Sequence, residues 1–151
     1  MISDTFIFRT FIIFNMPYLA LNCPKLHMVK DDEVNIIIPG HWPNKSFTGG
    51  LGFGPILSGA ECAAGFPISR LIKKSNLPLR FIVNKGEFFL RSKFRGSTIF
   101  SSYQPSLALN IQKVINENIK LEFPVVVQAS DQKSGENLGD FDFTLMISPN
   151  K

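Results

Sequence analysis

The feature that most constrains the fold is a long helical pattern in the middle of the chain, directly after a glycine-rich segment. Residues 56–74 (ILSGAECAAGFPISRLIKK) carry apolar side chains at helical spacing, and Pro55 before them suits a first helical position. The apolar positions are Leu57, Ala60, Ala64, Ile68, Leu71 and Ile72. We therefore predict a buried central helix. Pro67 should kink it or divide it in two, and Gly59 and Gly65 indicate that backbone or ligand comes very close to it.

The segments before this helix are typical of two short strands and a loop. Residues 26–29 and 33–38 are apolar runs separated by a charged KDD stretch, which predicts a hairpin or a sharp turn between strands. Residues 41–55 (HWPNKSFTGGLGFGP) are rich in Gly and Pro, so we predict that they form a loop.

The segments after the helix are predicted to be mostly strands. Residues 79–83 and 87–93 flank Asn84, Lys85 and Gly86, the pattern of a hairpin. Further strands are expected over residues 97–103, 121–129 and 141–148. Long antiparallel strands around one buried helix define an α+β protein, with a sheet wrapped on the helix.

Residues 105–118 fit two structures. Apolar side chains alternate with polar ones from Leu107 to Phe123, as in a strand, yet the same segment has apolar residues at helical spacing. Pro105 near its start favours a helix.

The N-terminal residues 5–21 are apolar enough to imitate a signal peptide or a membrane anchor. Asp4 and Arg9 do not suit the flanks of such a segment, and Pro17 cuts the apolar run below the length of a membrane span. We instead predict an N-terminal helix laid across the fold. Five of its side chains need an apolar partner: Phe6, Phe8, Phe11, Ile12 and Phe14.

Length and charge indicate one domain over residues 1–151, without a nucleic-acid partner. The net charge of +4 is small and the cations are mostly scattered. A loose group of cations fits a solvated strand edge and a phosphate contact equally well: Lys85, Arg91, Lys93 and Arg95.

Cysteine and histidine usage points to the cytoplasm and to a protein without a metal. Cys23 and Cys62 show no CxxC or metal-ligand spacing, which favours reduced structural thiols. His27 and His41 have no second ligand nearby in the sequence, so we predict no metal site.

Glu61 is the residue with the clearest chemical potential. Leu57, Ala64 and Ile68 lie at positions i−4, i+3 and i+7 from it, which places a carboxylate within the apolar stripe of the helix. A partly desolvated carboxylate suits proton transfer. The alternative is that Glu61 lies at the edge of the stripe and reaches solvent.

The order of elements and three local patterns resemble the hot-dog-fold thioesterases. Asn44 is followed by TGGLGFG, Glu61 lies seven residues after Gly54, and SGENLGDFDFTLMIS is similar to the last hairpin of such proteins. The resemblance covers residues 11–148 and points to an uncharacterised acyl-CoA thioesterase branch. One departure is Leu51, which stands where many relatives have His.

The resemblance implies a set of site residues. Glu61 would activate water or attack the carbonyl directly, and three backbone N–H groups at the helix N-terminus would stabilise the oxyanion. These donors would be Gly52, Phe53 and Gly54, although glycines here also suit a tight turn. Asn44 would orient water or the carbonyl. Ser58 would hydrogen-bond Glu61 or the water, or serve only packing, and Trp42 and Phe47 would line an acyl or pantetheine channel or pin the loop.

The resemblance also implies hydrolysis of an acyl-CoA or acyl-carrier thioester to the free acid, by a homodimer whose sites lie at the interface. Coenzyme A would enter only as part of the substrate, and no other cofactor is expected. Two other functions stay open. Leu51 and the Phe-rich composition suit a non-catalytic acyl- or lipid-binding protein. A hydratase or dehydratase of hydroxyacyl thioesters usually needs a His and acid pair, which the loop does not visibly supply.

Overall fold

The computed structural model describes residues 4–150, which form one antiparallel sheet with helices packed on it. The strands are β1 (Lys25–Val29), β2 (Glu33–Ile38), β3 (Leu79–Leu90), β4 (Thr98–Tyr103), β5 (Leu121–Asp131) and β6 (Asn137–Pro149). The helices are α1 (Asp4–Asn15), α2 (Pro17–Ala20), α3 (Phe53–Lys74) and α4 (Leu107–Glu117). The strand order is β1-β2-β4-β5-β6-β3, and neighbouring strands run antiparallel.

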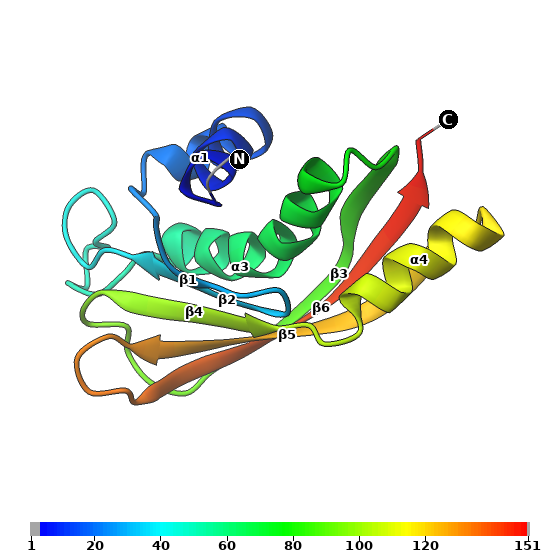
Figure 1. The fold of residues 1–151 in the computed structure, drawn as a ribbon. Coiled ribbons are helices and arrows are strands. Elements are labelled where there is room, and N and C mark those ends of the chain that lie inside the picture. The colour runs from blue at the N-terminus through cyan, green and yellow to red at the C-terminus, as the bar shows by residue number, and fades with distance from the viewer. Residues whose placement is uncertain (1–3, 151) are drawn as a thin grey trace.

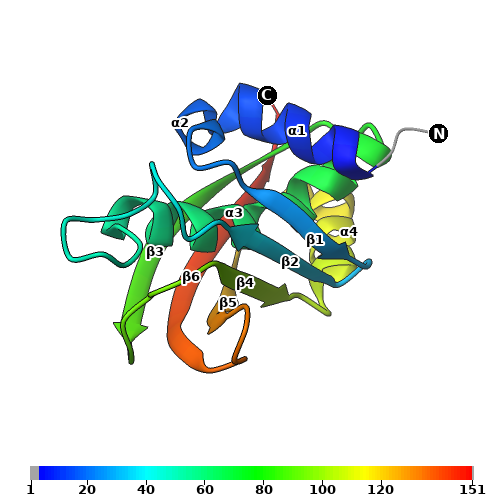
Figure 2. The ribbon, with the colours of Figure 1, turned by 90° about the vertical axis from the view of Figure 1, so that its left-hand side faces the viewer.

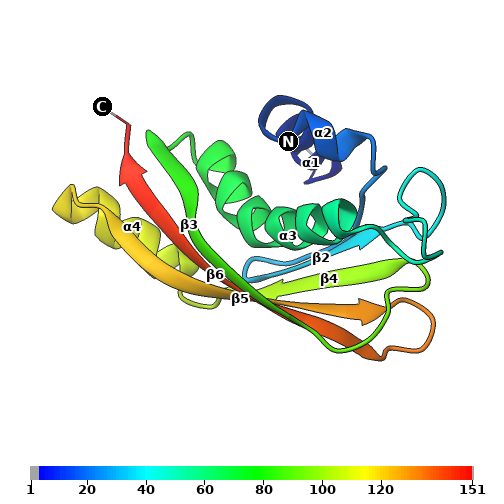
Figure 3. The same cartoon turned by 180° about the vertical axis from the view of Figure 1, so that it is seen from behind.

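The sheet curves around α3, and α1 lies on the side of α3 that faces away from the sheet (Figure 1). The view from behind shows the same layers, with α4 alongside β6 (Figure 3). This arrangement confirms the predicted α+β class, with a long central helix, an N-terminal helix and an extra helix between late strands. Within residues 4–150, no helix is long and apolar enough to cross a membrane.

The central helix α3 lies close to the sheet because it carries small residues on its contact face. A Cβ atom on Gly59 would lie 2.5 Å from Cε2 of Phe100 and 2.8 Å from Cγ1 of Ile38. Both partners are fully buried sheet residues. Burial of such side chains stabilises the fold by about 1.5–3 kcal/mol each. The close approach expected at Gly59 is present, but side chains of the sheet make it, and not backbone or a ligand.

The start of α3 differs from expectation, and of the two effects expected of Pro67 the structure shows a bend and not a division. The helix begins at Phe53, with Gly52 as its N-cap, so Pro55 occupies the third helical position. Pro67 does not divide the helix, which continues to Lys74. Its ribbon bends along its length (Figure 1), as expected where a proline cannot donate the usual backbone hydrogen bond.

The predicted N-terminal helix is present as two pieces. The longer helix α1 ends at Asn15, and Pro17 starts the single turn α2. Four of its side chains are buried: Ile7, Phe8, Phe11 and Ile12. Phe8 packs edge-on against Phe66 of α3, with ring centroids 5.0 Å apart. Phe6 and Phe14, for which an apolar partner was also expected, are 60% and 79% exposed.

The hairpin predicted around residues 84–86 was wrong. Residues 79–90 form the single strand β3, which pairs along its whole length with β6. The register shifts between Val83 and Lys85, so Asn84 occupies a β-bulge. A bulge bends a strand locally without reversing it, which explains why residues typical of a turn fit inside this strand.

The ambiguous segment 105–118 contains the helix α4, as favoured from Pro105. Asn118 follows the helix with φ of 51° and ψ of 42°, in the left-handed conformation that Asn tolerates at helix ends. The buried helix residues are Leu107, Ile111 and Val114. The alternation from Leu107 to Phe123 that suggested a strand therefore spans two elements, the helix α4 and the first residues of β5.

An ion cluster fastens the start of α1 to the end of α3. Asp4 Oδ1 lies 2.7 Å from both Arg70 Nε and Lys74 Nζ, and the Arg70 side chain is only 9% exposed. The hydrogen bond from Arg70 lowers the pKa of Asp4, burial opposes this, and Lys74 lowers it further. Because the folded pKa lies below the unfolded value, this carboxylate stabilises the fold above pH 3.8 and loses that effect as the pH falls through the folded pKa.

Replacement of Asp4 with Asn is expected to lower the free energy of unfolding by about 1–3 kcal/mol at neutral pH, since it leaves a buried guanidinium without its main partner. The difference from wild type should narrow below about pH 4. Urea unfolding at neutral and acidic pH measures both effects, with Asp142→Asn at an exposed position of β6 as the control. An equal loss at both pH values would contradict the ionic explanation.

Candidate active site

Glu61 lies on α3 at a half-buried position between two cavities. Its Oε2 accepts a hydrogen bond of 2.9 Å from the hydroxyl of Tyr18. The first cavity, about 340 Å³, is also lined by Phe11, Asn15, Met16, Gly65, Phe81, Ile82 and Val83. The second, about 230 Å³, is also lined by Leu57, Val83, Gly86, Glu87, Phe88, Phe141 and Phe143. A carboxylate thus lies beside two mostly apolar spaces, which is the setting expected from its place in the helical stripe.

Tyr18 was not anticipated from the sequence. Burial, and then its hydrogen bond to Glu61 and the charge of that residue, raise the pKa of Tyr18 to about 12. The phenol therefore stays protonated and remains a donor at neutral pH. The one available signal was that Tyr18 is the sole aromatic residue with a hydroxyl in an N-terminal segment otherwise rich in Phe.

The N-terminus of α3 offers two backbone donors. The N–H group of Gly52 already donates to the carbonyl oxygen of Asn44 at 2.8 Å, so the expected role of Gly52 in an oxyanion hole was wrong. Pro55 has no N–H group, and the N–H of Ile56 bonds the Gly52 oxygen. Among the described residues, Phe53 and Gly54 have no acceptor for their N–H groups, as is usual in the first turn of a helix.

Glu61 and these two donors are well separated on the same helix. Glu61 lies seven positions after Gly54, which corresponds to about 10 Å along the helix axis. A reacting carbonyl needs its oxyanion donors and its nucleophile each within about 3 Å. One chain therefore does not bring the two groups close together.

Asn44 is 1% exposed and all of its polar side-chain atoms have partners. Its Nδ2 donates to the carbonyl oxygens of Asn22 and Pro39, each at 2.9 Å, and its Oδ1 accepts from Asn22 Nδ2 at 2.8 Å. These bonds leave no group free to orient water. We interpret Asn44 as the residue that holds the glycine-rich loop against the segment after α2.

The remaining expected site residues lie apart from Glu61. Ser58 is buried, and the described part of the chain contains no hydrogen bond between it and Glu61. Trp42 and Phe47 are 83% and 102% exposed and line neither cavity beside Glu61. The Phe53 ring does approach the second cavity, because its centroid lies 5.3 Å from that of Phe88.

Cys62 is not available as a nucleophile. The side chain is fully buried, and burial, followed by the charge of Glu61, raises the pKa of this thiol well above its ordinary value. A protonated thiol is a poor nucleophile. Within residues 4–150, no group of three or more His, Cys, Asp or Glu side chains could hold a metal ion.

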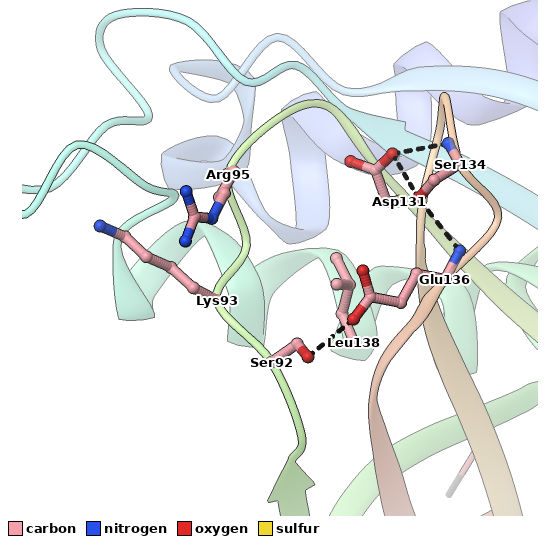
Figure 4. A pocket seen from close by; sticks show the side chains of 7 residues that line it. All are labelled: Ser92, Lys93, Arg95, Asp131, Ser134, Glu136 and Leu138. Carbon is pink, nitrogen blue, oxygen red and sulfur yellow. Dashed lines mark hydrogen bonds between the residues drawn. The ribbon is translucent and has the colours of Figure 1, made fainter.

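A third cavity, about 390 Å³, lies between the segment after β3 and the β5–β6 turn. Figure 4 shows its lining: Ser92, Lys93, Arg95, Asp131, Ser134, Glu136 and Leu138. Its carboxylates are already engaged, since Glu136 accepts a 2.8 Å hydrogen bond from Ser92 and Asp131 accepts from Ser134. The cavity thus combines both signs of charge and is not a purely cationic site.

The four cations of the loose group, Lys85, Arg91, Lys93 and Arg95, do not act together as one site. Lys85 pairs with Glu87 at 2.6 Å, Arg91 pairs with Asp140, and Lys93 donates to the backbone oxygen of Thr48. Three of the four cations therefore have partners in the chain. Of the two interpretations from the sequence, the solvated strand edge fits these contacts better than a phosphate site.

Comparison with known protein families and with curated proteins found no match to this sequence. Solved structures do match. One from Shewanella oneidensis, described as a "putative thioesterase", has a TM-score of 0.83 at 13% identity and covers 97% of this chain and 98% of its own. A protein of unknown function from Pseudomonas aeruginosa, described as a probable thioesterase, has a TM-score of 0.82 at 14% identity, covering 99% of both chains.

A mutant thioesterase from Pseudomonas aeruginosa is also similar, with a TM-score of 0.75 at 11% identity over 99% of this chain and 96% of its own. Near-complete coverage at such low identity establishes a shared fold. The predicted hot-dog fold is therefore confirmed, and the structures that share it include proteins described as thioesterases.

Proposed function

We propose that the protein hydrolyses an acyl-CoA or a related acyl thioester to the free acid and the thiol. The observation that carries the proposal is the place of Glu61, a half-buried carboxylate between two mostly apolar cavities. An apolar space beside a proton-accepting group suits an acyl chain next to the bond that is broken. The fold shared with proteins described as thioesterases supports the same function.

In this mechanism Glu61 acts as a general base. It takes a proton from water as the water oxygen attacks the thioester carbon, and the negative charge passes to the carbonyl oxygen. The N–H groups of Phe53 and Gly54, supplied by a second copy of the chain, stabilise that oxygen. The carbon–sulfur bond then breaks, and Glu61 returns the proton to the leaving sulfur. Direct attack by the Glu61 carboxylate, through an anhydride that water hydrolyses, is the second route.

We further propose that the working form is a homodimer joined through β3. This strand is at the edge of the sheet, and among residues 4–150 it pairs only with β6. Its side chains at Phe88 and Phe89 are 49% and 63% exposed, so its edge and its apolar side chains are both uncovered. Figure 2 shows the end of β3 on the same side of the molecule as the start of α3. A second copy on this edge would bring the N-terminus of the second copy's α3 toward Glu61 of the first. The oxyanion donors and the carboxylate, which lie about 10 Å apart along α3 within one chain, would then come from different copies.

We also propose a cytoplasmic location and coenzyme A as the thiol part of the substrate. Cys23 is exposed and Cys62 is buried, and neither is in a disulfide, which suits the cytoplasm. Coenzyme A would be part of the substrate and no resident cofactor would be needed.

The direct test is release of thiol from a panel of acyl-CoAs of different chain lengths by the purified protein. Turnover that saturates with substrate is expected for at least one chain length. Binding without turnover across the panel would instead favour the non-catalytic acyl- or lipid-binding protein, for which Leu51 in the loop is the specific observation. That residue is buried and its N–H donates to the Phe94 oxygen at 2.7 Å, so it offers no catalytic group.

The dimer can be tested separately with Phe89→Glu. A charge at this edge should give a monomer in light scattering and lower turnover about 100-fold, because the two halves of the site no longer meet. Leu109→Glu places the same charge on α4, at a side chain that is 67% exposed, and should leave both properties unchanged. A monomeric wild type with full activity would refute the shared site.

A further inference from the structure

Tyr18 is the residue of the N-terminal segment that reaches Glu61. It belongs to the single helical turn α2. Met16, just before α2, and Leu19, within it, are both buried. The backbone N–H of Leu19 donates to the Met16 oxygen at 2.8 Å. The chain around Tyr18 is therefore fixed by packing on both sides.

Asn22, just after α2, holds the other end of this segment. The N–H of Asn22 donates to the Leu19 oxygen at 2.9 Å, and the Asn22 side chain donates to Asn44 at 2.8 Å. Asn44 in turn donates to the Asn22 backbone oxygen at 2.9 Å. Because α2 is held at both ends, the backbone that carries Tyr18 is fixed, and its hydroxyl reaches Glu61 from a side chain that is 51% exposed.

The hydrogen bond from Tyr18 gives the two carboxylate oxygens of Glu61 different surroundings. Oε2 of Glu61 is held by Tyr18 at 2.9 Å, whereas Oε1 has no hydrogen-bond partner among residues 4–150. A free glutamate side chain samples several rotamers, and a donor on one oxygen selects among them. Oε1 then remains available to contact the substrate or water.

We propose that Tyr18 is a positioning residue that holds Oε2 of Glu61 so that Oε1 faces the thioester or the attacking water. This role rests on the proposed thioesterase function. It extends the active site to the N-terminal helices, which lie 43 residues away from Glu61 along the chain. The high pKa of Tyr18, about 12, agrees with it, because the phenol keeps its proton throughout the neutral range.

The kinetic test compares Tyr18→Phe with Tyr103→Phe in the full-length chain. The first substitution removes the hydroxyl and keeps the ring, and kcat should fall about tenfold with KM within about twofold of wild type. Tyr103 is the only other tyrosine and is 62% exposed on β4, so its substitution should leave both constants unchanged. Wild-type kcat in Tyr18→Phe would overturn the proposal.

A double variant separates positioning from direct action. If Tyr18 acts only through Glu61, then Tyr18→Phe should not lower the residual activity of Glu61→Gln any further. A further loss in the double variant would show that Tyr18 contacts the substrate itself, and the positioning role would be wrong. A wild type without any hydrolysis would instead overturn the proposed function, and with it any effect of Tyr18 on turnover.

A spectroscopic test does not depend on turnover. In Tyr103→Phe, Tyr18 is the single remaining tyrosine, and its near-ultraviolet absorbance reports ionisation. At about pH 11 we expect less tyrosinate in Tyr103→Phe than in Tyr103→Phe with Glu61→Gln, because the carboxylate disfavours the charged phenolate. Circular dichroism checks that both are folded. Equal tyrosinate fractions would show that the bond is absent in solution and would overturn the proposal.

Discussion

Replacement of Glu61 with glutamine is expected to lower kcat/KM for acyl-thioester hydrolysis by about 100- to 10,000-fold. Glutamine keeps the size and the hydrogen-bonding reach of the side chain but cannot accept a proton from water. Tyr18 can still donate to the amide oxygen, so the fold around α2 should be preserved. Thiol release measured over a range of substrate concentrations gives the constant, and unfolding curves confirm that stability is unchanged.

Glu87 provides a matched control for this experiment. It also lines the second cavity, but it lies on β3 and is paired with Lys85 at 2.6 Å. Glu87→Gln should change turnover by no more than about threefold, since a screened surface pair contributes little. Full activity in Glu61→Gln would remove this residue from the mechanism, and an equal loss in both variants would point to the general charge of the cavity.

Substitution of Gly59 by alanine should cost about 1–3 kcal/mol of unfolding free energy. Alanine gains about 1 kcal/mol in helix propensity over glycine, yet its Cβ would lie 2.5 Å from the Phe100 ring. That ring cannot retreat easily, because it is fully buried and lies 6.0 Å from Phe141, centroid to centroid. Overpacking should therefore exceed the gain, and thermal or urea unfolding measures the net loss.

Gly65 of the same helix supplies the comparison. Its Cβ would lie 3.1 Å from Cε2 of Phe81, a half-buried ring at the edge of the first cavity. The ring has room to move, so Gly65→Ala should be neutral or stabilising by up to about 1 kcal/mol. If both variants lost the same stability, the close approach of Gly59 to the sheet would not explain the first result.

Local pattern was enough to predict most elements of this fold. Helical spacing located α3 and the N-terminal helix, and the β-rich runs located all six strands of the sheet, in whole or in part. It failed at residues 84–86, where Asn, Lys and Gly are typical of a turn, but Asn84 occupies a bulge and Lys85 and Gly86 pair with β6. The difference lies in the partner strand: β6 continues to pair on both sides of Asn84. No sequence near Asn84 contains that information.

The candidate site was predictable only in part, for the same reason. Glu61 was identified because its neighbours on the helix reveal an apolar face. Tyr18 could not be assigned to Glu61, since their contact depends on how α2 docks on α3. Asn44 was identified as a functional candidate from its place in the loop, whereas its partners, Asn22 and Pro39, indicate a structural role. Polar residues in loops are therefore the hardest to interpret before their partners are known.

The reciprocal bonds between Asn22 and Asn44 also have a mechanical consequence. They join the end of the N-terminal helices to the loop that leads into α3. That loop is in turn attached through Leu51 to the Phe94 backbone. Hydrogen bonds therefore connect the loop to the segment that carries Tyr18, so a displacement of the loop by an entering substrate would act on the bond between Tyr18 and Glu61.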